Sequence, residues 1–303
     1  MLSKEEGAIK SIQQLSFFAS FSCKVVAISA GLSQHCFKVT ATDNMTNKRS
    51  TYFVKSITSQ NSIIANEATS AYLAASFSLS PNVIFHCSDW LVTEFMEGNN
   101  LSDIDMAIGK KIEIAITQLQ KLHSLSPSTK AKPISIAEII DEQINSGEFL
   151  AVQQDTLRVF KDTVTTFEPS ATKVLCHGDA NFSNFLIDQE NKCWLIDFEC
   201  SFIGNAEFDI AMFIAINNLG YDHLTPSYLS QVITCYSTCS DYVLDVPLIH
   251  AYLACCYLIN GMWYQSQSMA SKENEKFLAL AHQQYQCFDQ LHLSELKLIS
   301  VLA

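Results

Sequence analysis

The sequence HGDANFSN at residues 177–184, followed by DFE at residues 197–199, decides the fold and the chemistry that we expect of this chain. Asp179 and Asn184 lie five positions apart, and Asp197 comes thirteen positions after Asn184. A single loop aspartate usually caps a helix or ends a turn. Here, short apolar runs typical of strands separate the polar residues and place them on adjacent turns. These runs are Lys173–Cys176, Phe185–Asp188 and Cys193–Ile196.

The order and spacing of Asp179, Asn184 and Asp197 resemble those of protein kinases. In protein kinases the first aspartate accepts the proton of the hydroxyl acceptor, the asparagine holds a metal ion, and the second aspartate holds Mg²⁺ between the nucleotide phosphates. The resemblance implies phosphoryl transfer from ATP, with Asp179 as the base and with Asn184 and Asp197 as ligands of Mg²⁺.

The HGDxxxxN box, followed by a hydrophobic strand and DFE, is similar to that of the aminoglycoside phosphotransferase and choline kinase superfamily. Its members have a protein-kinase-like fold and phosphorylate small alcohols with ATP. The resemblance covers most of the chain and implies an α+β, bilobal fold. We expect residues 1–96 to form a small nucleotide-binding lobe with an antiparallel sheet and one helix. We expect residues 97–303 to form a larger, mainly helical lobe that carries the catalytic and acceptor-binding residues.

The hydrophobic pattern along the chain agrees with two such lobes. The first 96 residues alternate β-like runs with turns around one helical segment, whereas helical periodicity dominates from Ser102 onward. The expected strands are Lys24–Ser29, Cys36–Thr42, Thr51–Ile57, Val83–His86 and Leu91–Phe95. The expected helices are Asn61–Ser76, Asp103–His123, Ile136–Ile144, Phe149–Phe167, Phe208–Leu219, Pro247–Ser268 and Lys272–Leu291.

The nucleotide-binding residues follow from the resemblance. The stretch AGLSQHCFKV at residues 30–39 is similar to the phosphate-binding loop of the choline kinase superfamily, so the backbone amides of Ser33 and Gln34 are expected to bind phosphates. Lys55 is the expected partner of the α- and β-phosphates, and Glu67 is expected to orient it. Main-chain groups near Glu94 and Met96 are expected to bind adenine, because LVTEFMEG resembles the hinge of the superfamily.

The acceptor-binding residues are carried over in the same way. Glu199 places a further carboxylate beside the metal and the acceptor, and Asn181 lies two residues after the base. The segment Tyr257–Tyr264 resembles a choline kinase segment that reads WGLW; Trp263 matches its second tryptophan and Asn260 replaces the first. Phe202 is a further aromatic candidate. A cation over an aromatic ring gains about 0.5–2 kcal/mol, although each of these rings could equally well be packed in the core.

Composition narrows the class of partner. The chain has 303 residues, of which 48% are hydrophobic and 17% charged, and this suits a well-packed globular protein. Its net charge of −12 and its two arginines argue against nucleic acid as a partner and favour a cationic ligand. The resemblance implies that this ligand is a small alcohol. The cysteine count is 11, which is odd, and without CxxC pairs this indicates free thiols in a reducing cytoplasm.

Two observations bear on location. The first residues are acidic where a secretory signal would be basic, so no export is expected. No charged residue occurs from Val246 to Ser271, a length that could span a bilayer, but the segment carries several polar side chains that would be costly in lipid. We therefore expect a buried helix, no membrane insertion and a cytoplasmic protein.

Choline or ethanolamine is the first expectation for the acceptor. Thiamine, which is also a cationic alcohol, comes next, and an aminoglycoside follows. A nucleotide-binding pseudoenzyme is the alternative from another class, and the presence of the base and of both metal ligands argues against it. The sequence does not fix the oligomeric state.

Overall fold

A computed structural model describes residues 4–28, 35–57, 67–126, 135–146, 154–155, 158, 161–162, 173–219, 228–239, 242–270 and 274–291. The chain divides into two compact units. Unit 1 comprises residues 1–104, 128–131 and 185–201, and unit 2 comprises residues 105–127, 132–184 and 202–303. The lobe boundary that we expected between residues 96 and 97 remains a prediction.

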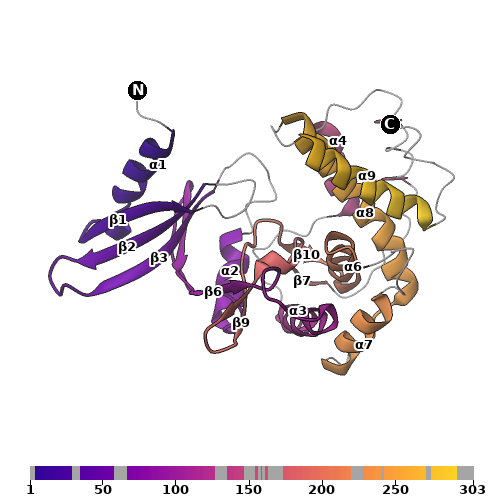
Figure 1. The fold of residues 1–303 in the computed structure, drawn as a ribbon, viewed down its shortest axis with the longest axis horizontal. Coiled ribbons are helices and arrows are strands. Elements are labelled where there is room, and N and C mark those ends of the chain that lie inside the picture. The colour runs from indigo at the N-terminus through magenta and orange to yellow at the C-terminus, as the bar shows by residue number, and fades with distance from the viewer. Residues whose placement is uncertain are drawn as a thin grey trace. The chain divides into compact units, whose positions relative to one another are not determined.

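Unit 1 is built on a five-stranded antiparallel sheet with the order β1-β2-β3-β5-β4. Strands β1, β2 and β3 lie side by side in Figure 1. Side chains of β2 alternate between buried and less buried positions, as expected for a strand with one face on a core. A separate three-stranded sheet has the order β6-β8-β9. The strands are β1 (Phe21–Ile28), β2 (Cys36–Asp43), β3 (Arg49–Ser56), β4 (Val83–His86), β5 (Trp90–Glu94), β6 (Gly98–Asn100), β8 (Phe185–Asp188) and β9 (Cys193–Leu195).

One face of the five-stranded sheet is covered by helix α1 (Lys4–Gln13), which packs along β1 (Figure 1). Ile12 of this helix and Phe18, from the short 3-10 turn Ser16–Phe18, join inward-facing residues of the sheet such as Val39 in one buried cluster. The second helix of unit 1 is α2 (Glu67–Ser76), which packs against β4.

Unit 2 is mainly helical and surrounds helix α6, whose residues 206–215 are all buried. A helix without an exposed polar face is typical of the centre of a domain. Helices α8 and α9 pack against each other, and α8 also packs against α6 (Figure 1). The elements are α3 (Ile108–His123), α4 (Ile136–Ser146), β7 (Val174–Cys176), a 3-10 turn (Phe182–Asn184), β10 (Phe202–Gly204), α6 (Ala206–Ile216), α7 (Leu229–Cys239), α8 (Val246–Ala270) and α9 (Asn274–Gln290).

Helix α8 contains the uncharged segment of the sequence. The stretch Val246–Met269 is long and apolar enough to cross a membrane, and 67% of its most apolar window is buried within the protein. Its packing against α6 and α9 is that of a core helix. The expectation of a buried helix is confirmed.

The observed elements agree with the expected α+β fold, with several differences. Helices α1 and α7 and the three-residue strands β6 and β10 were not predicted. Helix α3 begins at Ile108 rather than Asp103, because Asp103 N donates to Asn100 O in a turn before the helix. Most of the helix expected at Phe149–Phe167, and the start of the one expected at Asn61–Ser76, lie outside the described residues.

Candidate active site

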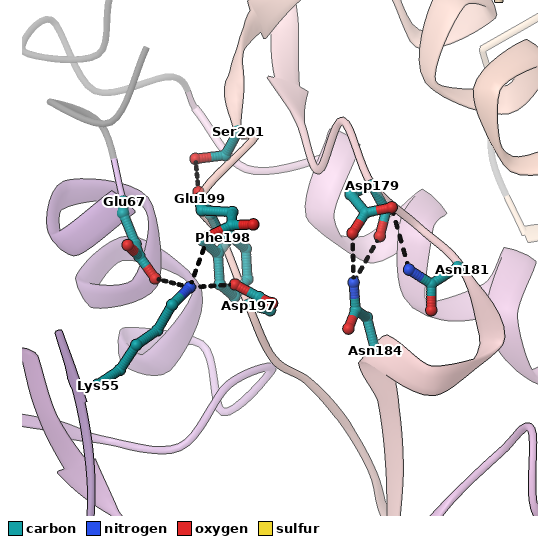
Figure 2. A network of polar contacts seen from close by, with 9 residues as sticks. All are labelled: Lys55, Glu67, Asp179, Asn181, Asn184, Asp197, Phe198, Glu199 and Ser201. Carbon is teal, nitrogen blue, oxygen red and sulfur yellow. Dashed lines mark hydrogen bonds and ion pairs between the residues drawn. The ribbon is translucent and has the colours of Figure 1, made fainter. Parts of the chain in front are cut away.

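Lys55 is the centre of a charged cluster in unit 1 (Figure 2). Its Nζ atom lies 2.9 Å from Glu67 Oε1 and 3.0 Å from Glu199 Oε2, and it also donates a short bond to Asp197 Oδ1. Lys55 and Glu67 are almost fully buried, with exposed fractions of 4% and 1%. The structure therefore joins the expected pair of Lys55 and Glu67 to Asp197 and Glu199, which were selected for other roles. Their roles toward a nucleotide remain predictions.

The sheet explains why Lys55 reaches these partners. Lys55 lies near the end of β3, a strand with neighbours on both sides, where it pairs with Cys36 of β2 and with Leu91 of β5. Glu67 is the first residue of α2, and Asp197 and Glu199 lie two and four residues after the end of β9. Residues far apart in the sequence thus meet at the ends of secondary-structure elements.

The electrostatics of the cluster are dominated by negative charge. Burial lowers the pKa of Lys55, but the charges of Asp197, Glu67 and Glu199 oppose burial and raise this pKa well above its ordinary value. Burial raises the pKa of Glu67, and the charge of Lys55 offsets only part of that rise. With every group ionised, one cation faces three carboxylates, so the cluster carries a net charge of −2. A divalent cation would neutralise it.

Asp197 has an unusual backbone conformation. Its φ is 65°, in the left-handed region that glycine, asparagine and aspartate tolerate best. Non-glycine residues in this region cost roughly 1–3 kcal/mol and concentrate at functional sites, where the surrounding structure holds them in place. The conformation is therefore consistent with a functional position for the Asp197 carboxylate.

Asp179 is the centre of a second group of side chains, which belongs to unit 2 (Figure 2). Asn181 Nδ2 donates to Asp179 Oδ1 at 3.0 Å, and Asn184 Nδ2 donates to Asp179 Oδ2 at 2.9 Å and to the Asp179 carbonyl at 2.8 Å. The amide nitrogen of Asn184 is thus turned toward Asp179. The side-chain oxygen of Asn184 lies on the other side of the planar amide, where it can coordinate a cation.

Asp209 of helix α6 anchors the backbone of this loop. Its carboxylate accepts hydrogen bonds from His177 N and Gly178 N, both at 2.8 Å, and His123 Nε2 lies 2.9 Å from Asp209 Oδ2. The Nδ1 atom of His123 lies 3.0 Å from the Tyr236 hydroxyl. Burial raises the pKa of Asp209, but the hydrogen bonds and charge of His123 and the bond from His177 N outweigh burial, so the pKa is lowered.

Asn217, at the end of α6, holds the other end of the loop. It accepts a hydrogen bond from Phe182 N at 2.9 Å and donates one to Ala180 O at 3.0 Å. The sequence analysis missed Asp209, His123 and Asn217. One signal was available, because a buried carboxylate in a helix as apolar as FDIAMFIAI must have hydrogen-bonding partners.

Asp209, His123 and Cys176 also place three possible metal-ligand atoms within 4.8 Å of one another. These atoms have other partners, however. His123 and Asp209 bond each other, and Cys176 Sγ lies 3.4 Å from Asn205 O. The contacts of these three residues are those of a buried hydrogen-bond network.

Trp263 belongs to a group of aromatic rings formed by α8 and α9. The Trp263 ring makes edge contacts with Tyr264 and Phe277, with centroids 5.2 and 6.2 Å apart, and Tyr264 stacks on Phe277. Burial raises the pKa of Tyr264, and the charge of Asp179 raises it further. The negative charge of Asp179 thus acts on this aromatic group.

The other residues predicted for the acceptor site have different surroundings. Phe202 is buried and packs edge-on against Phe208, which agrees with core packing rather than with acceptor binding. Asn260 is also buried, and its Nδ2 lies 3.4 Å from Gln284 Oε1. Glu199 belongs to the Lys55 cluster.

The residues predicted to bind adenine and phosphates are only partly described. Glu94 ends β5, where its Oε2 accepts a hydrogen bond from Asn82 Nδ2 at 2.9 Å, and Met96 follows in a half-buried position. Ser33 and Gln34 lie outside the described residues.

The chain is a phosphotransferase with a protein-kinase-like fold, as its family and its structural neighbours show. Residues 24–242 match the phosphotransferase enzyme family, and the chain belongs to this family. None of the curated proteins matches the sequence.

Solved structures of low sequence identity share the fold over nearly the whole chain. A choline/ethanolamine kinase family protein from Mesorhizobium loti is 18% identical, with a TM-score of 0.68 and coverage of 98% of both chains. A choline kinase from Streptococcus pneumoniae is 16% identical, with a TM-score of 0.68 and coverage of 98% of this chain and 100% of that one. A spectinomycin phosphotransferase in complex with ADP and spectinomycin is 14% identical, with a TM-score of 0.56 and 97% coverage of both.

Proposed function

We propose that this phosphotransferase moves the γ-phosphoryl group of ATP to the hydroxyl of a small cationic alcohol, with choline or ethanolamine as the first candidates. The observation that carries the proposal is the loop of Asp179, whose carboxylate is held by two amide side chains while its backbone is tied to Asp209. Fixed geometry of this kind is what general-base catalysis requires.

Asp179 orients the acceptor hydroxyl and takes its proton as the oxygen attacks phosphorus. A bond forms between the acceptor oxygen and the γ-phosphorus, the bond from that phosphorus to the leaving oxygen of ADP breaks, and the proton passes to Asp179. Proton transfer to a positioned base contributes about 10²–10⁴-fold to such a rate. Asn181 supports Asp179 by donating to Oδ1.

The residues present fit a magnesium ion. Asp197 and the oxygen of Asn184 would hold it, and the net charge of −2 on the Lys55 cluster favours a divalent cation. When bound, Mg²⁺ neutralises charge on the phosphoryl oxygens. Lys55 binds the α- and β-phosphates of ATP, and Glu67 keeps its ammonium group in place. Main-chain groups near Glu94 and Met96 bind adenine, and those of Ser33 and Gln34 bind phosphates.

A cationic acceptor is favoured by the aromatic group of Trp263, Tyr264 and Phe277. The charge of Asp179, which acts on Tyr264, adds a negative potential there. An ammonium group gains about 0.5–2 kcal/mol over an aromatic face. Glu199 is the further acceptor residue that we propose, whereas the packing of Phe202 against Phe208 favours a role in the core. The net charge of −12 gives such a substrate a favourable long-range field.

The test is a panel of acceptors that comprises choline, ethanolamine, thiamine, kanamycin and spectinomycin, with magnesium-dependent ADP release as the measurement. We expect turnover with choline or ethanolamine. Preference for thiamine would identify a thiamine kinase, and preference for an aminocyclitol or aminoglycoside would identify an antibiotic phosphotransferase. If no acceptor increases ADP release although nucleotide binds, the protein is a nucleotide-binding pseudoenzyme and the proposal fails.

The proposal places the reaction in the cytoplasm, where ATP and reduced thiols coexist. It assigns nucleotide binding to residues 1–96 and catalysis and acceptor binding to residues 97–303. Limited proteolysis with and without ATP would test this division, because the nucleotide should protect sites within residues 1–96.

A further inference from the structure

A polar hollow lies on unit 1, among residues to which no role has been assigned above. It is lined by Ser22, Cys23, Lys24, Thr40, Thr42 and Arg49 and has a volume of about 390 Å³. Neighbouring positions on β1, such as Phe21, Cys23 and Val25, pack against the buried cluster beneath α1. Because side chains alternate along a strand, Ser22 and Lys24 project from the opposite face of the sheet.

The strand register arranges this face in two rows. Ser22 of β1 lies opposite Thr42 of β2, which lies opposite Arg49 of β3. In the next row Lys24 lies opposite Thr40. Side chains that face each other across antiparallel strands have Cβ atoms about 5 Å apart, and successive rows are about 7 Å apart. The hydroxyl groups of the threonines therefore lie between one guanidinium and one ammonium group.

The two cations of the hollow have no carboxylate partner among the described residues. Among the residues that the structure describes, no ion pair joins Lys24 or Arg49 to an acidic side chain, and no acidic residue lines the hollow. Arg158, in contrast, pairs with Asp155 at 2.8 Å. The nearby Asp43 accepts hydrogen bonds from Met45 N and Thr46 N in the turn after β2. In a chain with 31 acidic and 19 basic residues, such a local excess of positive charge indicates an anionic ligand.

The extent of the positive surface limits the size of the anion. The next row begins with the exposed Val26 and continues with Lys38, whose Nζ atom lies 4.1 Å above the Phe95 ring and 3.9 Å from Glu97. Lys38 thus contacts Phe95 and Glu97 and does not line the hollow. Two cations match one dianionic group, whereas a polyanion such as nucleic acid requires many clustered cations.

We propose that this hollow binds a small phosphate oxyanion, either inorganic phosphate or the phosphate group of a phosphomonoester. Arg49 makes the bidentate contact that a planar guanidinium offers to phosphate, Lys24 contributes a point charge, and Ser22, Thr40 and Thr42 donate from their hydroxyl groups. Lys55 lies six residues beyond Arg49 on the same strand, which corresponds to about 20 Å. The hollow is therefore separate from the Lys55 cluster and independent of the proposed function.

The experiment is calorimetric titration of inorganic phosphate into the full-length protein in a magnesium-free buffer of low ionic strength. The wild type is compared with the double variant Lys24→Gln/Arg49→Gln and with the matched control Lys10→Gln/Lys121→Gln. The control removes two exposed positive charges from other sites. We expect the Lys24→Gln/Arg49→Gln variant, called the hollow variant below, to bind phosphate at least about tenfold more weakly than the wild type. The reason is that it loses two charge-assisted contacts. The control should stay within about twofold of the wild type.

A second arm replaces inorganic phosphate with glycerol 3-phosphate. Tighter binding of the ester would identify a phosphomonoester as the ligand, and tighter binding of inorganic phosphate would identify free phosphate; in both cases binding must depend on Lys24 and Arg49. Absence of phosphate binding by the wild type overturns the proposal. So does an unchanged affinity in the hollow variant, or an equal loss in the control. Because all four substituted side chains are exposed, thermal melts should show a native fold for every variant.

Discussion

The Lys55 cluster and the Asp179 loop both present carboxylates, but they are held by different forces. Glu67, Asp197 and Glu199 share one buried ammonium group, so their arrangement depends on charge. The Asp179 carboxylate accepts from the neutral amides of Asn181 and Asn184, and its backbone is held through Asp209. The first cluster, with its net charge of −2, therefore suits the metal ion that we propose. In the second group, amide hydrogen bonds hold the carboxylate that we propose as the base.

Replacement of the base should have the largest effect. Asp179→Asn retains the size of the side chain but cannot take a proton, so we expect kcat to fall by about 10²–10⁴-fold. The Kd for ATP should change little, because Asp179 is assigned to the acceptor. Steady-state kinetics and nucleotide titration measure both quantities. The exposed Asp105→Asn is the matched control, and near-native turnover of the Asp179 variant would rule out its role as the base.

Removal of the cation should affect stability as well as activity. Lys55→Met leaves three carboxylates without their shared partner, and breaking a buried pair costs about 3–5 kcal/mol of unfolding free energy. The double variant Lys55→Met/Glu67→Leu should recover part of this stability without recovering affinity for ATP. Urea denaturation and ATP binding separate the two effects. Recovery of ATP affinity in the double variant would show that Lys55 has only a structural role.

Loss of the anchor beneath the Asp179 loop should have an intermediate effect. Asp209→Asn keeps the side-chain shape but weakens the bonds from His177 N and Gly178 N, so we expect kcat to fall about tenfold with a smaller change in the KM for ATP. Asp245→Asn, whose carboxylate bonds Leu248 N at an exposed site, is a suitable control. Equal losses in both variants would contradict the role of Asp209 in positioning the loop.

The stability contributed by Asp209 should depend on pH. Its pKa is lower in the folded protein than its ordinary value of 3.8, so the unfolded chain binds the proton more readily. The contribution is complete above pH 3.8 and is lost as the pH falls through the folded pKa. The difference in unfolding free energy between wild type and Asp209→Asn should therefore shrink below about pH 4. A difference that stays constant across urea denaturations from pH 7 to pH 3 would contradict this assignment.

The aromatic group should have the smallest effect on kcat. Trp263→Leu keeps an apolar side chain but removes the aromatic face, and we expect the KM for a cationic acceptor to rise about 2–30-fold with kcat for saturating acceptor less affected. Trp194→Leu is the matched control, because it removes a tryptophan of unit 1 whose ring lies beneath Lys192 and to which no role in acceptor binding is assigned. If the KM for a neutral alcohol rose equally, packing rather than cation binding would explain the change.

Local patterns predicted the elements that carry their own signals. Val83–His86 and Phe185–Asp188 coincide with β4 and β8, because turn residues bound these short apolar runs on both sides. Asp179, Asn184 and Asp197 were selected through their spacing, and their roles remain predictions. The bonds of Glu199 to Lys55 and of Asp209 to the loop backbone join residues that are 144 and up to 32 positions apart. Only the tertiary fold determines such pairings. Helix α1 was not predicted for a different reason, because its sequence KEEGAIKSIQ has a weak apolar face.

The left-handed backbone of Asp197 also restricts how this position can vary over evolutionary time. A β-branched residue there would be severely strained, whereas asparagine and glycine adopt the same φ readily. A lineage that abandoned catalysis would therefore most easily acquire Asn or Gly at position 197 and keep the hairpin intact.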